Sequence, residues 1–171
     1  VPIATTEGGL IASVSRGLKA LRAGRLTAAV TKDGMTRSPC LKFESLSDAM
    51  AFKMVLETSP EKVHTSFDSS TSHGKLVSFD IKVVGRLVYL TITATTGLAM
   101  GMNMLSKGAE AVLTSLSADS MVPMFEVITL SGNTCTDKKT SAVNLARGRG
   151  KSVTAECTIP AAAVSSVLKT T

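Results

Sequence analysis

The stretch LVSFDIKVVGRLVYLTIT, residues 76–93, decides the fold of this chain. Apolar residues occupy every second position in both halves of the stretch, which is the period of a strand with one buried face. Gly85-Arg86 stands between the halves and suits a tight turn with glycine at its first central position. The stretch therefore predicts an antiparallel hairpin of two strands.

Further strands and helices are expected on both sides of this hairpin. Before the hairpin we expect a strand at 39–44, a helix that begins with a capping box at 45–48 and is interrupted at 59–60, and a Ser/Thr-rich loop at 67–74. After the hairpin we expect a glycine-bearing loop at 97–101, the helix that this loop opens, and a strand at 124–130. This order is that of the split βαβ, ferredoxin-like arrangement. The predicted fold class is therefore α+β.

The two ends of the chain fit this arrangement less well. Residues 151–159 indicate a further strand and residues 160–168 a helix with proline in its first turn. Together with residues 1–20, these segments are expected to belong to a neighbouring, larger domain. The first residues lack an initiator Met and a signal-peptide pattern, so we expect the chain to begin inside a longer protein.

The composition narrows the classes of partner. The net charge is +6, aromatic residues make up 4%, and the only Tyr is Tyr89. Readers of single-stranded nucleic acid usually stack bases on several aromatic side chains, so the charge favours a small molecule that bears phosphate, with plain solubility as the alternative. The three widely spaced cysteines and two histidines predict neither disulfides nor a metal site.

Two glycine-bearing stretches carry candidate chemistry. The sequence SGNTCTDKK, residues 131–139, follows an apolar strand. Its two lysines beside an aspartate can bind a carboxylate and polarise a carbonyl oxygen, although a solvated turn would look the same. The sequence GLAMGMNM, residues 97–104, opens a helix whose N-terminus can hold a pyrophosphate, with a Met-rich core helix as the alternative.

Isolated charged residues give weaker signals. Glu7 can donate a proton if it is buried beside a lysine, and is otherwise a surface residue. Asp33-Gly34 indicates a turn, and Arg37 beyond it can fork onto a carboxylate. His73 lies in a hydroxyl-rich loop that can meet a phosphate. Four cations recur every three residues and form either a phosphate site or a solvated helix face: Arg16, Lys19, Arg22 and Arg25.

Six motifs, taken in order, resemble the class I (eukaryotic-type) 3-hydroxy-3-methylglutaryl-coenzyme A (HMG-CoA) reductase family. They are PIATTEG at 2–8, DGMTR at 33–37, MGMNM at 100–104, SGN at 131–133, TDKK at 136–139 and GRGKSV at 148–153. The resemblance implies a large α/β substrate domain with a smaller, ferredoxin-like NADP(H)-binding domain inserted in it. Residues 1–36 would belong to the large substrate- and CoA-binding domain and 37–130 to the small domain. Residues 131–171 would form the catalytic loop and the return segment of the large domain.

The resemblance also implies an activity. The family reduces HMG-CoA to mevalonate and CoA with two NADPH, for isoprenoid and sterol biosynthesis. Its members are homo-oligomers, and neither a metal nor a nucleic acid is implied. The parent protein would be anchored in the endoplasmic reticulum membrane with this part facing the cytosol. A catalytic aspartate and a C-terminal histidine of the family lie outside the chain, so the chain alone is expected to be inactive.

The resemblance assigns roles to individual residues. Lys138 would stabilise the oxyanion, and Glu7 would be the catalytic acid. The substrate-binding residues would be Arg37, Ser131, Asp137 and Lys139. The CoA-binding residues would be Ser13, Arg16, Lys19 and Lys169. The cofactor-binding residues would be Ser72, His73, Met100, Gly101, Met102 and Asn103.

The sequence departs from the family pattern at a few positions. Leu98 stands where the family usually has Asp, and His73-Gly74 where it has Arg-Phe. Thr134 replaces a usual Tyr, and Thr140 a usual Pro. Two other interpretations remain beside the reductase: an inactive paralogue with a regulatory role, and a ferredoxin-like RNA-binding module that would need exposed aromatics such as Phe79 and Tyr89.

Overall fold

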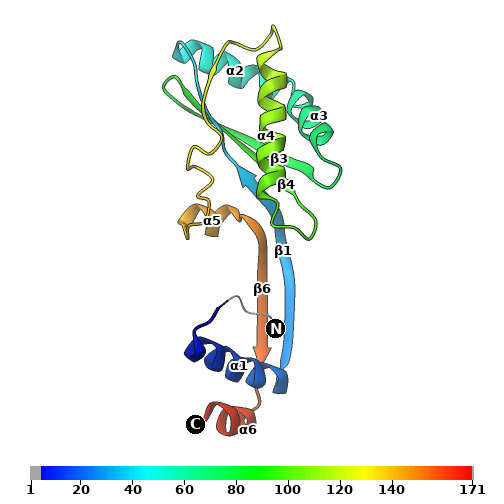
Figure 1. Ribbon diagram of the computed structural model, residues 1–171, viewed down its shortest axis with the longest axis vertical. Coiled ribbons are helices and arrows are strands. Elements are labelled where there is room, and N and C mark those ends of the chain that lie inside the picture. The colour runs from blue at the N-terminus through cyan, green and yellow to red at the C-terminus, as the bar shows by residue number, and fades with distance from the viewer. Residues whose placement is uncertain (1–4, 171) are drawn as a thin grey trace. The chain divides into compact units, whose positions relative to one another are not determined.

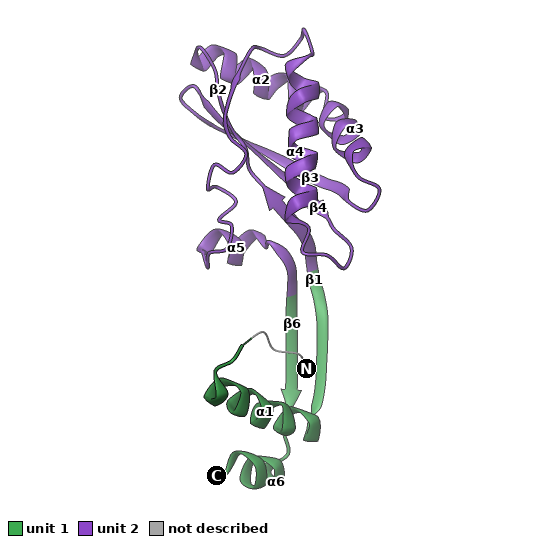
Figure 2. Cartoon of the chain, in the orientation of Figure 1, with its two compact units in different colours: residues 1–31, 153–171 green, residues 32–152 purple. Residues whose placement is uncertain are grey.

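The computed structural model describes residues 5–170, so Pro2, Ile3 and Ala4 of the first motif lie outside the described residues. The chain divides into two compact units (Figure 2). Residues 32–152 form one, which we call the inserted unit. The described residues of 1–31 and 153–171 form the other, the terminal unit. The inserted unit is continuous in sequence and interrupts the terminal unit.

The helices and strands follow one another as in Figure 1. They are α1 (Gly8–Ala23), β1 (Arg25–Arg37), β2 (Cys40–Lys42), α2 (Leu46–Thr58), α3 (Glu61–Ser70), β3 (Lys75–Val84), β4 (Leu87–Thr95), α4 (Met102–Ser117), β5 (Glu126–Thr129), α5 (Ala142–Arg147), β6 (Gly150–Thr158), α6 (Ala161–Ala163) and the π-helix η1 (Val164–Leu168).

Strand β4 is the centre of the sheet in the inserted unit. It pairs antiparallel with β3 on one side, and with β2 and the end of β1 on the other. Strand β2 also pairs antiparallel with β5. The predicted hairpin is confirmed: β3 and β4 pair from Val84↔Leu87 to Lys75↔Thr95, with one register shift between Leu76 and Ser78. Gly85 takes the positive φ of 58° that the turn requires.

The hydrophobic core lies between one face of this sheet and the helices α2, α3 and α4 (Figure 1). Every second residue of β4 is buried, as its period-two pattern predicts. The rings of Phe43, Phe52 and Phe125 pack on one another with centroids 5.1–5.9 Å apart. The core therefore fixes the sheet and α4, from which the site residues extend.

Local signals of helix boundaries are confirmed at α2. The Ser45 hydroxyl accepts a hydrogen bond from the Asp48 N–H at 3.1 Å, as the capping box predicts. The helix ends at Thr58, just before the expected interruption at Ser59-Pro60. Helix α3 continues to Ser70, so the loop expected at 67–74 begins only at residue 71.

The turn expected at Asp33-Gly34 is wrong, because both residues lie inside β1. A Cβ built on Gly34 would lie 2.7 Å from Thr93 Cγ2. The glycine therefore serves close packing against the neighbouring strand β4 rather than chain reversal. Strand β1 itself and the short helix α5 were not expected.

The terminal unit is built around the 16-residue helix α1. The π-helix η1 packs against α1, and its last residue is followed by Lys169 with φ 59°. The strand and helix expected at 151–159 and 160–168 are present as β6 and as α6 with η1. Within residues 5–170, no helix is long and apolar enough to cross a membrane.

Candidate active site

Residues 131–141 lie between β5 and α5, and we call them the catalytic loop after the role that we propose for them below. Three residues of this loop other than glycine have positive φ: Asn133 at 64°, Thr136 at 46° and Lys138 at 57°. This conformation is unfavourable for side chains with a Cβ and persists only where surrounding contacts impose it. The strain is therefore concentrated at and around the lysine that the sequence singled out.

The side chain of Asn144, on α5, holds the middle of the catalytic loop. Its Oδ1 accepts a hydrogen bond from the Thr136 hydroxyl. Its Nδ2 donates to the carbonyl oxygens of Thr136 at 3.2 Å and Lys139 at 3.1 Å. One amide thus binds the backbone on both sides of Asp137 and Lys138.

The start of the catalytic loop rests on β2 and β4. The Gly132 N–H donates to the carbonyl oxygen of Ser38 at 2.7 Å. A Cβ on Gly132 would lie 2.8 Å from the Tyr89 ring and 3.0 Å from the Cys40 Cβ, so only glycine fits this approach. The electrostatic effect of the neighbouring Cys40, followed by burial and by a hydrogen bond with Cys40, raises the pKa of the Tyr89 phenol. Thr134 hydrogen-bonds the buried hydroxyl of Ser38.

Asp137 lies between two arginines. Arg149 is 3.0 Å from Asp137 Oδ1, and Arg37 is 3.8 Å from Oδ2. Both guanidinium side chains are largely buried, with 11% and 15% of their surface exposed. Lys138 and Lys139 are exposed beside this group, and among residues 5–170 neither forms an ion pair. Their positive charge is thus available to an anionic group.

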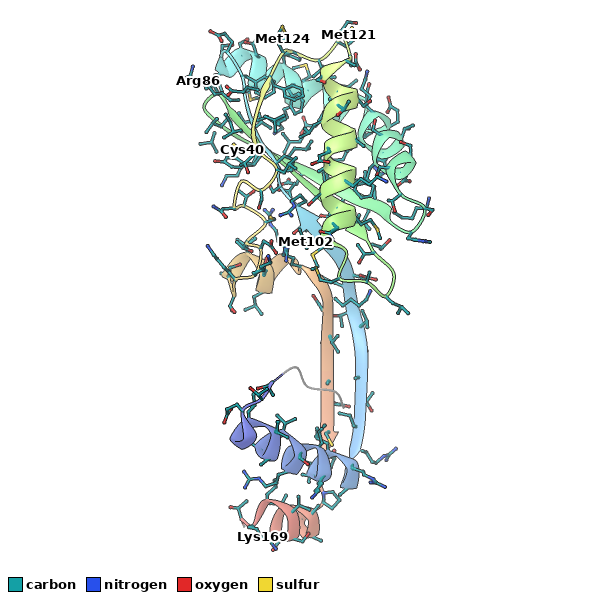
Figure 3. All side chains as sticks on the ribbon, viewed as in Figure 1. Cys40, Arg86, Met102, Met121, Met124 and Lys169 are labelled. Atoms are coloured by element: carbon teal, nitrogen blue, oxygen red, sulfur yellow. The ribbon has the colours of Figure 1, made fainter. Side chains whose placement is uncertain are left out.

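Both arginines also reach α4. Arg37 donates to the Ser106 hydroxyl at 2.9 and 3.2 Å. Arg149 donates to Met102 Sδ at 3.0 Å and to the Thr36 hydroxyl at 3.1 Å. Met102 stands at the start of α4 (Figure 3). The catalytic loop therefore lies beside the N-terminus of this helix.

The start of α4 has the features of an anion-binding helix terminus. Gly101 caps it with φ 83°, and a Cβ there would lie 2.1 Å from Thr96 Cγ2. No side chain within residues 5–170 caps the helix by a hydrogen bond, and its first turn has no acidic residue. The free N–H groups and the positive end of the helix dipole suit a phosphate. The side chain of Met102 is buried, so this residue can offer a ligand only its backbone.

The loop at 71–74 lies against the same helix start. A Cβ on Gly74 would lie 2.7 Å from Met104 Sδ, which places this loop in contact with the first turn of α4. Ser72 and His73 are exposed in this loop, and Met100 and Asn103 are exposed on the α4 side. The two segments expected to bind the cofactor are therefore neighbours.

The terminal unit contains the other expected residues. Glu7 is the N-cap of α1 and accepts a hydrogen bond from the Leu10 N–H at 3.1 Å. A hollow of about 510 Å³ is lined by Ala12, Ser15, Arg16, Lys19, Ser166 and Val167. Arg16 and Lys19 thus face one hollow between α1 and η1, whereas Ser13 is exposed outside its lining.

Some of the residues predicted to form the site lie together in one unit, and others lie in different units. Arg37 and Asp137 pair within the inserted unit. Ser131 begins the catalytic loop, with its hydroxyl 3.8 Å from Cys135 Sγ. Glu7 belongs to the terminal unit and Lys138 to the inserted unit. Asn144 and Arg149 were missed, although Arg149 lies in the GRGKSV motif. In residues 5–170, no group of three or more metal-ligating side chains occurs.

The fold resembles that of known reductases. A 3-hydroxy-3-methylglutaryl-coenzyme A reductase of Streptococcus pneumoniae matches 91% of this chain and 40% of that chain, with a TM-score of 0.60 and 22% identity. A class II enzyme from the same organism, solved bound to NADPH in open conformations, gives a TM-score of 0.59 at 20% identity and covers 91% of this chain and 40% of that one. At this level of identity, the likeness concerns the α+β fold alone.

Sequence comparison gives the family. The family model described as hydroxymethylglutaryl-coenzyme A reductase matches residues 1–171. Reductases of Strongylocentrotus purpuratus and Methanothermobacter thermautotrophicus are 48% and 47% identical over 99% and 100% of this chain. The chain belongs to the hydroxymethylglutaryl-coenzyme A reductase family. It spans 18% and 43% of the length of these two relatives, and 14% of a Phycomyces blakesleeanus reductase to which it is 46% identical.

Proposed function

We propose that this chain is part of an NADPH-dependent reductase that converts HMG-CoA to mevalonate and CoA. The observation that carries the proposal is the contact of one side chain, Arg149, with both Asp137 of the catalytic loop and Met102 at the start of α4. This contact brings a loop with two free lysines beside a helix terminus suited to phosphate. Reduction of a thioester by a dinucleotide requires these two kinds of site to be neighbours.

Lys138 would act on the thioester carbonyl. NADPH supplies the hydride, and addition of a hydride to the carbonyl carbon leaves a negative oxygen. The exposed Lys138 ammonium, on a backbone held by Asn144, would stabilise this oxygen. Glu7 would supply the proton. Arg37, Asp137 and Lys139, with Ser131, would hold the hydroxymethylglutaryl part, because cations and hydroxyls suit its carboxylate.

The cofactor and CoA would bind through phosphate-recognising groups. The uncapped start of α4 fits the pyrophosphate of NADPH, through backbone N–H groups of Met102 and Asn103 beside Met100 and Gly101. Ser72 and His73 on the adjoining loop would face the rest of the dinucleotide. In the terminal unit, Arg16 and Lys19 in their shared hollow, with Ser13 and Lys169, would hold the phosphates of CoA.

The architecture we propose is a ferredoxin-like NADP(H)-binding domain inserted in a larger substrate domain. The antiparallel order β5–β2–β4–β3, with helices between β2 and β3 and between β4 and β5, supports this topology. We assign 37–130 to the small domain, and 1–36 and 131–171 to the large one. The intact protein would be a homo-oligomer anchored in the endoplasmic reticulum membrane, with this part facing the cytosol.

Turnover by the intact protein tests the proposal. Purified reductase carrying this chain should oxidise NADPH only when HMG-CoA is present, and should release mevalonate. Binding of both ligands without mevalonate would instead indicate the inactive paralogue. The RNA-binding interpretation has less support, because Phe79 packs against the hydrophobic core. Residues 1–171 expressed alone should yield no mevalonate.

A further inference from the structure

We infer that Arg149 is a positioning residue that couples the start of α4 to the catalytic loop. The inference rests on the proposed function, since it concerns how the two halves of that site act together. Arg149 lies outside the sets of residues proposed to bind substrate, CoA or cofactor. Its side chain is largely buried, with 11% of its surface exposed, so it contacts neighbouring protein groups rather than a ligand.

The contacts of Arg149 join three elements that are distant in sequence. Its Nε donates to the Thr36 hydroxyl at 3.1 Å, across 113 residues. Its Nη2 lies 3.0 Å from Met102 Sδ, 3.4 Å from the Thr36 carbonyl oxygen and 3.0 Å from Asp137 Oδ1. A planar guanidinium with several fixed donors can serve β1, α4 and the loop together, whereas an ammonium cannot match this geometry.

A second arginine repeats the arrangement one turn further along α4. Arg37 joins the Ser106 hydroxyl to Asp137. Met102 and Ser106 are four residues apart, so they share one face of the helix. Asp137 is therefore held by two guanidinium groups that are both anchored to that face. A displacement of the start of α4 would therefore move Asp137, and it would also move Lys138, which follows Asp137 in the backbone.

The coupling has a thermodynamic consequence. A ligand that fixes the start of α4 also fixes the catalytic loop through Arg149 and Asp137. Binding at one site must then favour binding at the other by the same factor, because linkage between two sites is reciprocal. The dinucleotide, oxidised or reduced, is expected to bind more tightly when HMG-CoA is present, and Arg149 transmits this effect together with Arg37.

The experiment compares variants of the intact reductase. The test variant is Arg149→Gln and the conservative one Arg149→Lys. The matched control is Arg147→Gln, because the Arg147 side chain is 72% exposed and, among the described residues, forms an ion pair only with Asp80 at the surface. Two quantities are measured. The first is the dissociation constant of the oxidised cofactor NADP⁺ with and without HMG-CoA, a pair of ligands that cannot react with each other. The second is hydrogen–deuterium exchange of residues 133–141 in the ligand-free protein.

In Arg149→Gln, loop exchange should rise about tenfold, and the effect of HMG-CoA on the NADP⁺ dissociation constant should fall about tenfold, the size expected for one charge-assisted hydrogen bond. Arg149→Lys should change both quantities in the same direction by less. Arg147→Gln should match the wild type. Unchanged exchange and unchanged coupling in Arg149→Gln would overturn the inference.

The two proposals fail in distinguishable ways. If the wild-type protein neither binds NADPH nor makes mevalonate, the proposed function is wrong. Exchange of the ligand-free loop still decides whether Arg149 positions it. If Arg149→Gln does not fold, Arg149→Lys decides: faster loop exchange supports the inference, and wild-type exchange rejects it.

Discussion

Asn144 donates a hydrogen bond from its Nδ2 to the carbonyl oxygen of Lys139 at 3.1 Å. The same nitrogen donates to the carbonyl oxygen of Thr136, and Oδ1 accepts from the Thr136 hydroxyl. Carbonyl oxygens cannot donate, so only this orientation of the amide satisfies all three contacts. Asn144 thus encloses the positive-φ residue Lys138 in a closed set of hydrogen bonds.

Replacing Asn144 by Asp should release the catalytic loop. An aspartate oxygen would face two carbonyl oxygens where the amide had donated to both, and a hydrogen bond lost at a partly buried site costs about 1–3 kcal/mol. We expect kcat for mevalonate formation to fall about 10- to 100-fold with little change in folding. Asn144→Ala removes the donors without adding charge and should lose less. Equal activity of Asn144→Asp and wild type would contradict this role.

Replacing Lys138 by Ala should abolish the chemical step while leaving cofactor binding intact. Loss of a single group that stabilises an oxyanion typically lowers kcat about 100- to 1,000-fold. The NADPH dissociation constant should stay as in the wild type, because the start of α4 is unchanged. Steady-state mevalonate formation and an NADPH titration measure the two quantities. Turnover within tenfold of the wild type would exclude Lys138 as the catalytic group.

The sequence predicted those parts of the fold whose signals are local. The hairpin followed from period-two alternation, and α2 from a cap that the structure retains. Strand β1 was missed because Asp33-Gly34 is a turn signal, and only the neighbouring Thr93 explains a glycine inside a strand there. For the proposed site, motifs singled out Asp137 and Lys138, whose roles stay predictions. The role of Arg149 depends on partners up to 113 residues away, which no local pattern contains.

Gly108, the one glycine within α4, should resist replacement by alanine. A Cβ there would lie 2.2 Å from Cε2 of Phe67, whose side chain is fully buried. Helix propensity alone favours Ala by about 1 kcal/mol. The steric cost of placing a Cβ against Phe67 should exceed this gain in helix propensity. Gly108→Ala is therefore expected to lower the free energy of unfolding by about 1–3 kcal/mol. Urea unfolding measures the change.

Gly17 provides the matched control. It lies in α1, where a Cβ meets no heavy atom within 4 Å. Gly17→Ala should therefore stabilise the protein by up to about 1 kcal/mol. If both substitutions shift the unfolding free energy in the same direction, the proposed role of Gly108, close packing of α4 against Phe67, is wrong.

The nucleotide preference should respond to His73. His73 is exposed in the loop that lies against the first turn of α4. An arginine presents a planar fork of donors that can form two parallel hydrogen bonds to a 2′-phosphate, which the histidine ring cannot do. His73→Arg should improve the ratio of NADPH to NADH affinity about tenfold, measured by paired binding isotherms. An unchanged ratio would mean that this loop does not contact the 2′-phosphate.

The ion pair between Lys62 and Asp119 predicts an acid-sensitive contribution to stability. The hydrogen bond from Lys62, followed by that from the Met121 N–H, lowers the pKa of the Asp119 carboxyl. A lowered carboxyl pKa stabilises the fold above the ordinary value of about 3.9 and stops doing so as pH falls through the lowered value. The Tm of Lys62→Met should thus lie below that of the wild type at pH 6, and the two should converge in strong acid. A gap that is constant with pH would refute the assignment.

Lys151 Nζ and Asp33 Oδ2 are 2.6 Å apart, and these residues stand next to the first and last residues of the inserted unit. The 121-residue inserted unit thus begins and ends at neighbouring points, which this ion pair joins. Closing such a gap requires only a few residues and little loop entropy. The whole insertion can therefore be deleted or replaced by another domain, because its removal leaves two chain ends that are already close enough to be joined.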